Sequence, residues 1–472
     1  MAVVHEVIII GAGIAGLAAA AKLAPRFSRN DVLILEGSSR IGGRLRSEHW
    51  ENADVCIERG ANWVHGPSES NPIYRLAAAG GLEGHLDDRD ELCHVRCAAT
   101  GKAFDQQAQE RSQAFDIAFE HLSQLATNET SDFGCAAGLR AGGWVPKTPL
   151  DDAIEWLKFD FEYSSDPSEA SAFHNVREEH TRTDFGEDSF LITDRRGFDT
   201  LAHSLAESAL AAGTQIHHDT IVSVIDASTA DEDGYVTLHV AGSHGTHRAK
   251  RVIVTASVGV LQSGLIQFTP ELPLPLLRDL HSIRQALYLK VFAAWPRPWW
   301  RQGLDAEGSE GVAPELGADH TLLVSQNRRG VWPLLTVVTE GDAEGDGSAA
   351  VLCATLVGQE AWAMENSTDD EVAASLHATL VSAFPSTRVP LPYAHRVCRW
   401  GTDPLFRGAY SFLPTGALPD GWQHLQAPLY SGKVWLAGEA IHERYSGYLH
   451  GAFLSGEDVA TRIIASLDCI DS

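Results

Sequence analysis

Lysine, cysteine and long apolar runs are all scarce in this sequence of 472 residues. Only seven lysines occur, and acidic residues (63) far outnumber basic ones (36), which leaves a formal net charge of −27. Such a charge repels nucleic acid and anionic lipid, so binding to either is not expected. The seven cysteines are an odd number and few for this length, which fits a reducing compartment better than a disulfide scaffold.

No stretch has the pattern of a membrane span, a signal peptide or a metal site. The longest apolar run, residues 7–21, is interrupted by glycines and is shorter than the roughly 20 residues that cross a bilayer. It also lacks a preceding basic segment, so a cytoplasmic location is expected. Cys93 and Cys97 form the one close cysteine pair, and no second pair at zinc spacing accompanies them. No bound metal is therefore expected.

The first 36 residues have the pattern of a strand, a glycine-rich turn, a helix and a second strand that ends in an acid. Gly11, Gly13 and Gly16 occupy G-x-G-x-x-G positions after the β-branched run 5–10, and Glu36 lies twenty residues beyond Gly16. The glycines would let the backbone approach a pyrophosphate at a helix N-terminus. The acid would bind ribose hydroxyls and repel a 2′-phosphate. The sequence therefore predicts a dinucleotide-binding βαβ unit.

A second glycine-rich segment, residues 38–44 (SSRIGGR), adds two arginines that could neutralise the same pyrophosphate. Nicotinamide enzymes do not usually need such an element. Together with residues 58–66 (ERGANWVHG), 435–439 (WLAGE) and 445–452 (YSGYLHGA), it resembles the flavin-containing amine oxidase family over essentially the whole chain. The resemblance implies an α/β fold in which a Rossmann-type FAD-binding domain is joined to a mixed α+β substrate-binding domain.

The domain boundaries follow from the positions of these blocks and of the strand-like segments between them. We expect a discontinuous FAD-binding domain formed by residues 1–85, 195–272 and 425–472. Residues 86–194 and 273–424 are expected to form the substrate-binding domain, inserted in two pieces.

The resemblance also implies which residues bind FAD. In monoamine oxidases a cysteine in the block 408–412 (GAYSF) links the flavin covalently, and the corresponding residue here is Ala409, so non-covalent FAD is expected. A valine backbone usually contacts the adenine, for which Val222 fits, with Val224 nearly as good. The cofactor-binding residues expected from the family are Gly11, Gly13, Gly16, Glu36, Arg44, Gly60, Ala61, Asn62, Trp63, Val222, Glu439 and Tyr448.

Lys290 is unusual because it stands in the apolar segment 286–292 (ALYLKVF). A buried, unpaired ammonium is costly and tends to lose its proton. The lysine therefore either reaches solvent from a strand edge or has a function. The resemblance implies a function, because the family lysine of this block binds a water that touches flavin N5 and assists reoxidation by oxygen.

Residues 63–68 (WVHGPS), followed by Asn71 and Pro72, are similar to the animal-type polyamine oxidases. These enzymes carry a histidine after the Trp-aliphatic pair, where the best-known plant enzymes carry glutamate. The likeness implies that His65 lies in the substrate channel beside the flavin. A loop histidine satisfied by backbone groups is the alternative.

Two tyrosines and an acidic stretch complete the expected substrate site. Tyr410 and Tyr448 match the family aromatics that flank the reacting carbon, and aromatic faces attract a cationic amine. Plain packing is the alternative for both. Glu162 and Asp166 match an acidic stretch at the channel mouth, and either could face the substrate or solvent. We expect catalytic roles for Lys290, His65, Tyr448 and Tyr410, and substrate contacts from His65, Glu162, Tyr410 and Tyr448.

The resemblance implies FAD-dependent oxidation of a secondary amine of spermine, spermidine or their N-acetyl derivatives. Hydride would pass to flavin N5, the imine would hydrolyse to an aldehyde and a shorter amine, and oxygen would be reduced to hydrogen peroxide. A monoamine or L-amino-acid oxidase and a non-catalytic flavin-binding protein are the alternatives. The expected partners are a polycationic amine and oxygen, and the expected assembly is a monomer or weak homodimer.

Overall fold

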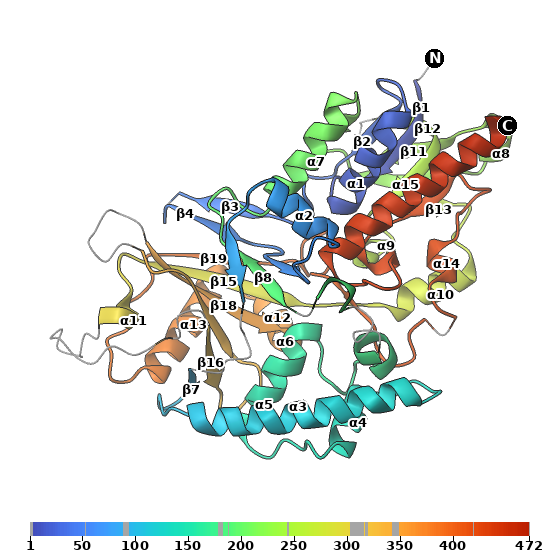
Figure 1. Ribbon diagram of the computed structural model, residues 1–472. Coiled ribbons are helices and arrows are strands. Elements are labelled where there is room, and N and C mark those ends of the chain that lie inside the picture. Colours follow the sequence, from blue (N-terminus) through green and yellow to red (C-terminus); the bar gives the residue numbers. More distant parts are fainter. Residues whose placement is uncertain are drawn as a thin grey trace.

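Two β-sheets of different kinds organise the molecule, and both chain ends lie beside the first of them (Figure 1). The structure is a computed structural model. It describes residues 3–51, 53–87, 94–177, 183–186, 188–242, 245–302, 316, 320–341, 349–418 and 420–471.

The first sheet is mostly parallel and joins three distant parts of the chain. Its strand order is β13-β10-β11-β12-β1-β2-β9, and β21 pairs with the end of β12. Strands β1 and β2 are rich in isoleucine, leucine and valine, as expected for strands buried on both faces. The strands are β1 (Val4–Ile10), β2 (Val32–Leu35), β9 (Gln215–His217), β10 (Val222–Asp226), β11 (Val236–Val240), β12 (Thr246–Val254), β13 (Gln267–Thr269) and β21 (Val434–Leu436).

Helices cover both faces of this sheet. Val7 and Ile9 of β1 pack into one helical layer, whereas Ile8 and Ile10 pack into the other, because successive strand side chains point to opposite faces. Figure 1 shows three helices of the first layer in a row, with α1 between α7 and α15. That layer contains α1 (Ile14–Leu23), α7 (Thr200–Ala211) and α15 (Leu449–Asp471), and the other contains α9 (Val258–Gln262), α10 (Leu274–Ser282) and α14 (Gln423–Gln426).

The second sheet is antiparallel except where β7 joins its edge, and its strand order is β19-β15-β18-β17-β16-β7. Leu289 and Val291 of β15 pack into a core with α12 and α13. Phe292 points to the opposite face, against the hairpin of β3 and β4. These elements are β3 (Ser47–Trp50), β4 (Val55–Glu58), β7 (Val95–Cys97), β15 (Tyr288–Trp295), β16 (His320–Val324), β17 (Leu334–Thr339), β18 (Ala350–Val357), β19 (Ala394–Cys398), α12 (Gly358–Glu365) and α13 (Asp369–Ala383).

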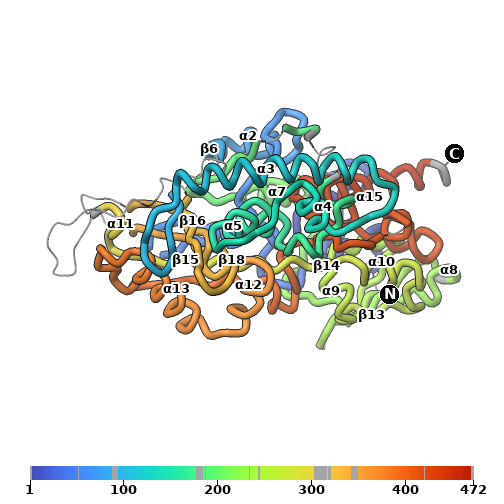
Figure 2. Tube along the Cα trace, turned by 90° about the horizontal axis from the view of Figure 1, so that it is seen from below, coloured from blue at the N-terminus to red at the C-terminus, as the bar shows by residue number. Residues whose placement is uncertain are grey.

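A helical layer packs against β16 and β7 at one end of the second sheet, and its long helix α3 lies along the bottom of the molecule in Figure 1 and crosses the view from below in Figure 2. Within this layer, α5 begins with a capping box between Thr148 and Asp151 and continues through the π-helical turn η2 into α6. Ser164, in the left-handed conformation (φ 48°), ends this run. The layer contains α3 (Asp105–Asn128), α4 (Cys135–Ala141), α5 (Pro149–Glu155), η2 (Trp156–Asp160), α6 (Phe161–Tyr163) and η3 (Ala172–Arg177).

Besides the β3–β4 hairpin, the described residues form two small sheets. One has the order β5-β8-β6, and the other pairs β14 with β20. Their strands are β5 (Trp63–His65), β6 (Gly84–Leu86), β8 (Ser189–Ile192), β14 (Arg284–Gln285) and β20 (Ser411–Phe412). The remaining elements are η1 (Ala24–Arg26), α2 (Pro72–Ala79), η5 (Thr183–Phe185), α8 (Ala230–Asp233), α11 (Trp299–Gln302) and η6 (Glu439–Ile441).

The expected α/β fold class, with a Rossmann-type unit beside a mixed unit, is confirmed. The first sheet draws its strands from the segments expected to bind FAD, and the second sheet from those expected to bind substrate. Helix α10 and Trp422, which lie outside the expected FAD-binding segments, nevertheless pack into the core of the first sheet. The precise domain boundaries stay a prediction. No helix among the described residues is long and apolar enough to span a membrane.

Candidate active site

The glycine-rich turn between β1 and α1 depends on its glycines. Gly11 has a φ of +103°, which side chains rarely tolerate, and a Cβ on Gly16 would lie 2.0 Å from the carbonyl oxygen of Gly11. At Gly13 a Cβ would approach the Gly43 Cα alone, at 4.0 Å, so this part of the turn presents bare backbone. No side chain of the described residues caps α1, and its first turn has no acidic residue. The amides of that turn can therefore bind an anion.

Glu36 lies at the carboxyl end of β2, directly beside this turn. The Ala12 amide donates a hydrogen bond to its Oε2 (2.7 Å), and the amide and hydroxyl of Ser38 donate to its Oε1 (2.8 and 2.7 Å). The Thr220 amide donates to the Glu36 carbonyl, which brings the start of β10 and Val222 alongside. Val222 is buried and Val224 is half-buried. The acid and the valine strand thus meet next to the turn, as a dinucleotide site requires.

Arg44 connects the second glycine-rich segment to the end of the chain. Its guanidinium donates to Oε1 of Glu439 (3.0 Å) and to the Ala409 carbonyl (2.9 Å). The other Glu439 oxygen accepts from the Ser411 hydroxyl (2.5 Å) and the Gly447 amide (3.0 Å). Three segments far apart in sequence are therefore held together at the N-terminus of α15.

The segment 59–61 packs directly on Arg44. The Ala61 amide donates to the Arg44 carbonyl (3.3 Å). A Cβ on Gly60 would lie 1.7 Å from that same carbonyl oxygen, so only glycine fits. The predicted FAD-binding residues 60–63 therefore lie beside the second glycine-rich segment.

Lys290 is fully enclosed. It lies on the interior strand β15, with β18 and β19 on its two sides, so the strand-edge alternative is wrong. Its Nζ donates to the carbonyls of Glu58 (3.1 Å) and Gly60 (2.7 Å) and to Oδ1 of Asn62 (2.7 Å). It lies 5.5 Å from the centre of the Trp63 ring. Burial lowers the pKa of Lys290, partly opposed by the nearby Cys353, Cys398 and Glu58.

His65 and Tyr448 meet each other. Their ring centres are 5.2 Å apart in an edge-to-face arrangement, and His450 stacks on Tyr448 at 5.1 Å. His65 Nδ1 is 3.1 Å from the Ser189 hydroxyl. The structure thus gives His65 side-chain partners on β8 and just before α15.

Tyr410 belongs to a second aromatic group. Its hydroxyl is 2.6 Å from the Ser164 hydroxyl and donates to the Glu162 carbonyl (3.3 Å), and its ring lies 6.3 Å from Tyr288. The centres of the Phe161 and Tyr288 rings are 5.8 Å apart. A Cβ on Gly447 would lie 3.9 Å from Tyr410, so this group adjoins the residue before Tyr448.

Sequence reasoning missed three members of this group: Tyr288, Phe161 and Ser164. Tyr288 had a signal, because residues two apart on a strand share a face and Lys290 was already singled out. Phe161 and Ser164 had none, because a π-helical turn places them. Of the two acids considered at the channel mouth, Glu162 is half-buried beside Tyr410 and Asp166 is exposed.

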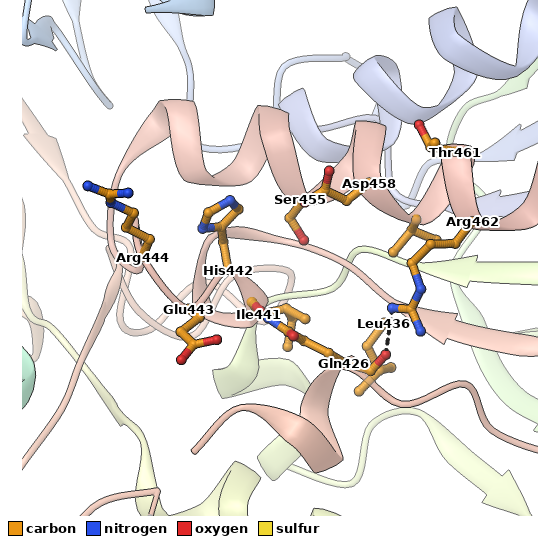
Figure 3. A pocket seen from close by; sticks show the side chains of 11 residues that line it. Gln426, Leu436, Ile441, His442, Glu443, Arg444, Ser455, Asp458, Thr461 and Arg462 are labelled. Carbon is orange, nitrogen blue, oxygen red and sulfur yellow. Dashed lines mark hydrogen bonds between the residues drawn. The ribbon is translucent and has the colours of Figure 1, made fainter. Parts of the chain in front are cut away.

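A separate cleft with a volume of about 800 Å³ opens between α14, η6 and α15 (Figure 3). In Figure 3, Arg444, His442 and Glu443 stand at one end and Arg462 at the other, where its guanidinium donates to the Gln426 carbonyl. None of the residues predicted from the sequence lines it. No group of potential metal ligands occurs among the described residues, and Cys93 lies outside them.

The donors and acceptors around the glycine-rich turn fit FAD. The uncapped N-terminus of α1 and Arg44 suit a pyrophosphate, Glu36 suits a ribose, and the bare backbone at Gly13 leaves room for close approach. A Rossmann-type unit with this turn, joined to an antiparallel sheet that carries an enclosed lysine, defines a two-domain flavoprotein oxidoreductase.

Comparisons with known proteins identify the class more closely. Residues 14–464 match the family of flavin containing amine oxidoreductases, so the chain belongs to that family and FAD is its cofactor. Polyamine oxidase 6 of rice (Oryza sativa subsp. japonica) is 31% identical over 97% of this chain and 90% of its own. The human peroxisomal N(1)-acetyl-spermine/spermidine oxidase is 26% identical over 98% of this chain and 95% of its own.

The fold has solved counterparts. Putrescine oxidase bound to putrescine superposes with a TM-score of 0.72 at 18% identity, over 98% of this chain and 100% of the other. Cyclohexylamine oxidase from Brevibacterium oxydans gives 0.70 at 21% identity. Although His65 is the histidine expected of animal-type enzymes, identity over the whole chain is higher to the rice enzyme than to the human one.

Proposed function

We propose that this protein is an FAD-dependent polyamine oxidase. It oxidises a secondary amine of spermine, spermidine or an N-acetyl derivative to an imine, which water cleaves to an aldehyde and a shorter amine. Oxygen takes up the two electrons and two protons as hydrogen peroxide. The observation that carries the proposal is the aromatic group of Phe161, Tyr288 and Tyr410 beside the half-buried Glu162, next to the enclosed Lys290. Relatives named as polyamine oxidases support it.

The aromatic group recognises the substrate by its charge. A polyamine is a flexible polycation, and aromatic faces attract cations within about 6 Å of the ring centre. The backbone of Glu162 bonds the Tyr410 hydroxyl, its half-buried side chain adds a negative charge to this segment, and the formal net charge of −27 draws polycations to the protein. His65 and Tyr448 form the other wall of the site, and together these side chains orient the reacting carbon.

FAD supplies the hydride acceptor when it is bound. The residues of this chain that would lie beside its reacting ring are Lys290 and its partners. A lysine ammonium has three donors, and Glu58, Gly60 and Asn62 accept all three. The first two acceptors are backbone carbonyls, whereas Asn62 accepts through a side chain that can rotate. If Asn62 rotates away, the freed donor of Lys290 would be available to a water that assists the oxygen step.

Anaerobic mixing tests the proposed substrate class. The purified flavoprotein is mixed separately with spermine, spermidine, N-acetylspermine, benzylamine and L-leucine, and the flavin absorbance is followed. We expect bleaching by one or more polyamines and by neither of the other two, followed by hydrogen peroxide formation when oxygen is admitted. Bleaching by benzylamine or L-leucine alone would favour a monoamine or amino-acid oxidase. A flavin that none of them reduces would contradict the proposal.

We also propose that FAD is bound without a covalent link, because Ala409 has no nucleophile at the position where monoamine oxidases carry a cysteine. Acid precipitation should then release all the flavin into the supernatant. Yellow colour retained in the denatured pellet would contradict this.

A further inference from the structure

Trp63 has a buried acid as its hydrogen-bond partner. Its indole Nε1 donates to Oδ2 of Asp87 at 2.6 Å, a short distance for a nitrogen donor. The Asp87 side chain is 1% exposed, and it follows β6 in the small sheet that also contains β5 and Trp63. Because a buried carboxylate needs compensation, its other oxygen must also have a donor.

His320 provides that donor. Its Nε2 lies 2.9 Å from Oδ1 of Asp87, and its Nδ1 lies 3.0 Å from the hydroxyl of Thr336 on the neighbouring strand β17. With both ring nitrogens held, the imidazole has one orientation. His320 begins β16 of the second sheet, so the Asp87–His320 pair links the small sheet to the large one.

Trp63, held by Asp87, contacts both Lys290 and the aromatic group. Nζ of Lys290 lies 5.5 Å from the centre of the Trp63 ring, and the centres of the Trp63 and Phe161 rings are 6.3 Å apart in an edge-to-face arrangement. Asn62, which accepts from Lys290, is the preceding residue. The ring therefore lies between the enclosed lysine and the aromatic group.

We propose that Asp87 and His320 are positioning residues that fix Trp63 and, through it, the ammonium of Lys290. This inference rests on the proposed function, because the step it affects is the oxygen reaction assigned to Lys290. Misplacing a catalytic group by about 1 Å can slow a step by as much as a hundredfold. Loss of the Asp87 carboxylate should thus slow reoxidation of the flavin more than its reduction.

The first readout needs no substrate. The indole N–H of Trp63 gives one resonance in the NMR spectrum, identified as the one missing in Trp63→Phe. A short hydrogen bond to a carboxylate shifts such a proton downfield, so Asp87→Asn should move it upfield. Asp279→Asn is the matched control, because Asp279 is also buried and bound to a histidine, His424 at 2.6 Å, on α10 and α14. An unmoved Trp63 resonance in Asp87→Asn would overturn the proposal.

The second readout is the rate of flavin reoxidation by oxygen after reduction with dithionite. We expect roughly a tenfold slowing in Asp87→Asn and none in Asp279→Asn. In the Trp63→Phe background, which has no indole N–H, Asp87→Asn should add no further slowing. Equal slowing by Asp87→Asn in both backgrounds would show an effect that bypasses Trp63 and would refute the proposal.

Two His320 variants keep the test decisive if Asp87→Asn does not fold. The amide of His320→Gln can still donate to Asp87, so it should retain the Trp63 resonance and the reoxidation rate. His320→Leu cannot donate and should change both. If the two variants behave alike, the proposal fails. Dithionite reduces the flavin without an amine substrate, and the NMR measurement requires no reduction at all. If the protein does not oxidise polyamines, these results should therefore be unchanged.

Discussion

The two halves of the site are built in different ways. Around the glycine-rich turn, the contacts depend on the backbone: the Ala12 amide donates to the Glu36 carboxylate, and the Thr220 amide donates to the Glu36 carbonyl. Around Lys290, they join residues 228 to 232 apart and depend on one side chain. In the nucleotide half, the space around the backbone decides which substitutions are tolerated. In the amine half, the charge and orientation of side chains decide it. Substitutions should therefore fail differently in the two halves.

Gly16→Ala should have the largest effect and should act on folding. Its Cβ would lie 2.0 Å from the Gly11 carbonyl oxygen, so the turn must shift at a cost of about 3 kcal/mol. Urea unfolding of the FAD-free protein measures this. Gly13→Ala is the control: its Cβ has space, so the stability of the FAD-free protein should stay within about 0.5 kcal/mol of the original while FAD affinity falls. Equal destabilisation by both variants would show that the space around each glycine backbone does not determine which residues the turn accepts.

Lys290→Met should leave FAD bound and slow turnover by roughly a hundredfold. Methionine fills a similar volume, but it removes the ammonium that Glu58, Gly60 and Asn62 accept from. Stopped-flow kinetics should assign the loss to the oxygen step and leave reduction by spermine less affected. Unchanged kinetics would contradict the role proposed for Lys290. Loss of the flavin would contradict the view that the two halves of the site respond differently to substitution.

Glu58 should make stability depend on pH. Burial raises its pKa to about 7 from an ordinary 4.5, so between these values the folded protein keeps a proton that the unfolded chain has lost. Its stabilising contribution is therefore complete below pH 4.5 and is lost as the pH rises to about 7, a change of about 3 kcal/mol. Urea unfolding at pH 5 and pH 8 should show a smaller difference for Glu58→Gln than for the original protein. Identical differences would show that Glu58 ionises normally.

Tyr410→Phe should have the smallest effect. It removes the hydroxyl bonded to Ser164 and Glu162 but keeps the ring, so we expect the KM for spermine to rise roughly threefold with little change in kcat. Tyr430→Phe, which removes a hydroxyl bonded to the Pro270 carbonyl away from this group, is the matched control. A large fall in kcat in Tyr410→Phe would give the hydroxyl a role in the chemistry itself.

The difference between the two halves also explains which features could be predicted from the sequence. The βαβ unit and Glu36 could be predicted because local spacing determines them, and burial of Lys290 could be predicted from its apolar neighbours. Its acceptors could not, because Glu58 and Gly60 contribute backbone carbonyls that no motif encodes. Asp87 and His320 lie in no recognisable pattern, and folding alone brings them together.

The contact between Gly60 and Arg44 joins the predicted cofactor side of the molecule to Lys290. Gly60 supplies one acceptor to Lys290, and its own backbone rests on the carbonyl of Arg44, which belongs to the pyrophosphate-side segment. Whatever orders Arg44 thus also orders the lysine, and coupling of this kind is reciprocal. The segment predicted to bind the FAD pyrophosphate and the lysine predicted to act in the oxygen step are therefore one packed unit, so a displacement of the first should displace the second.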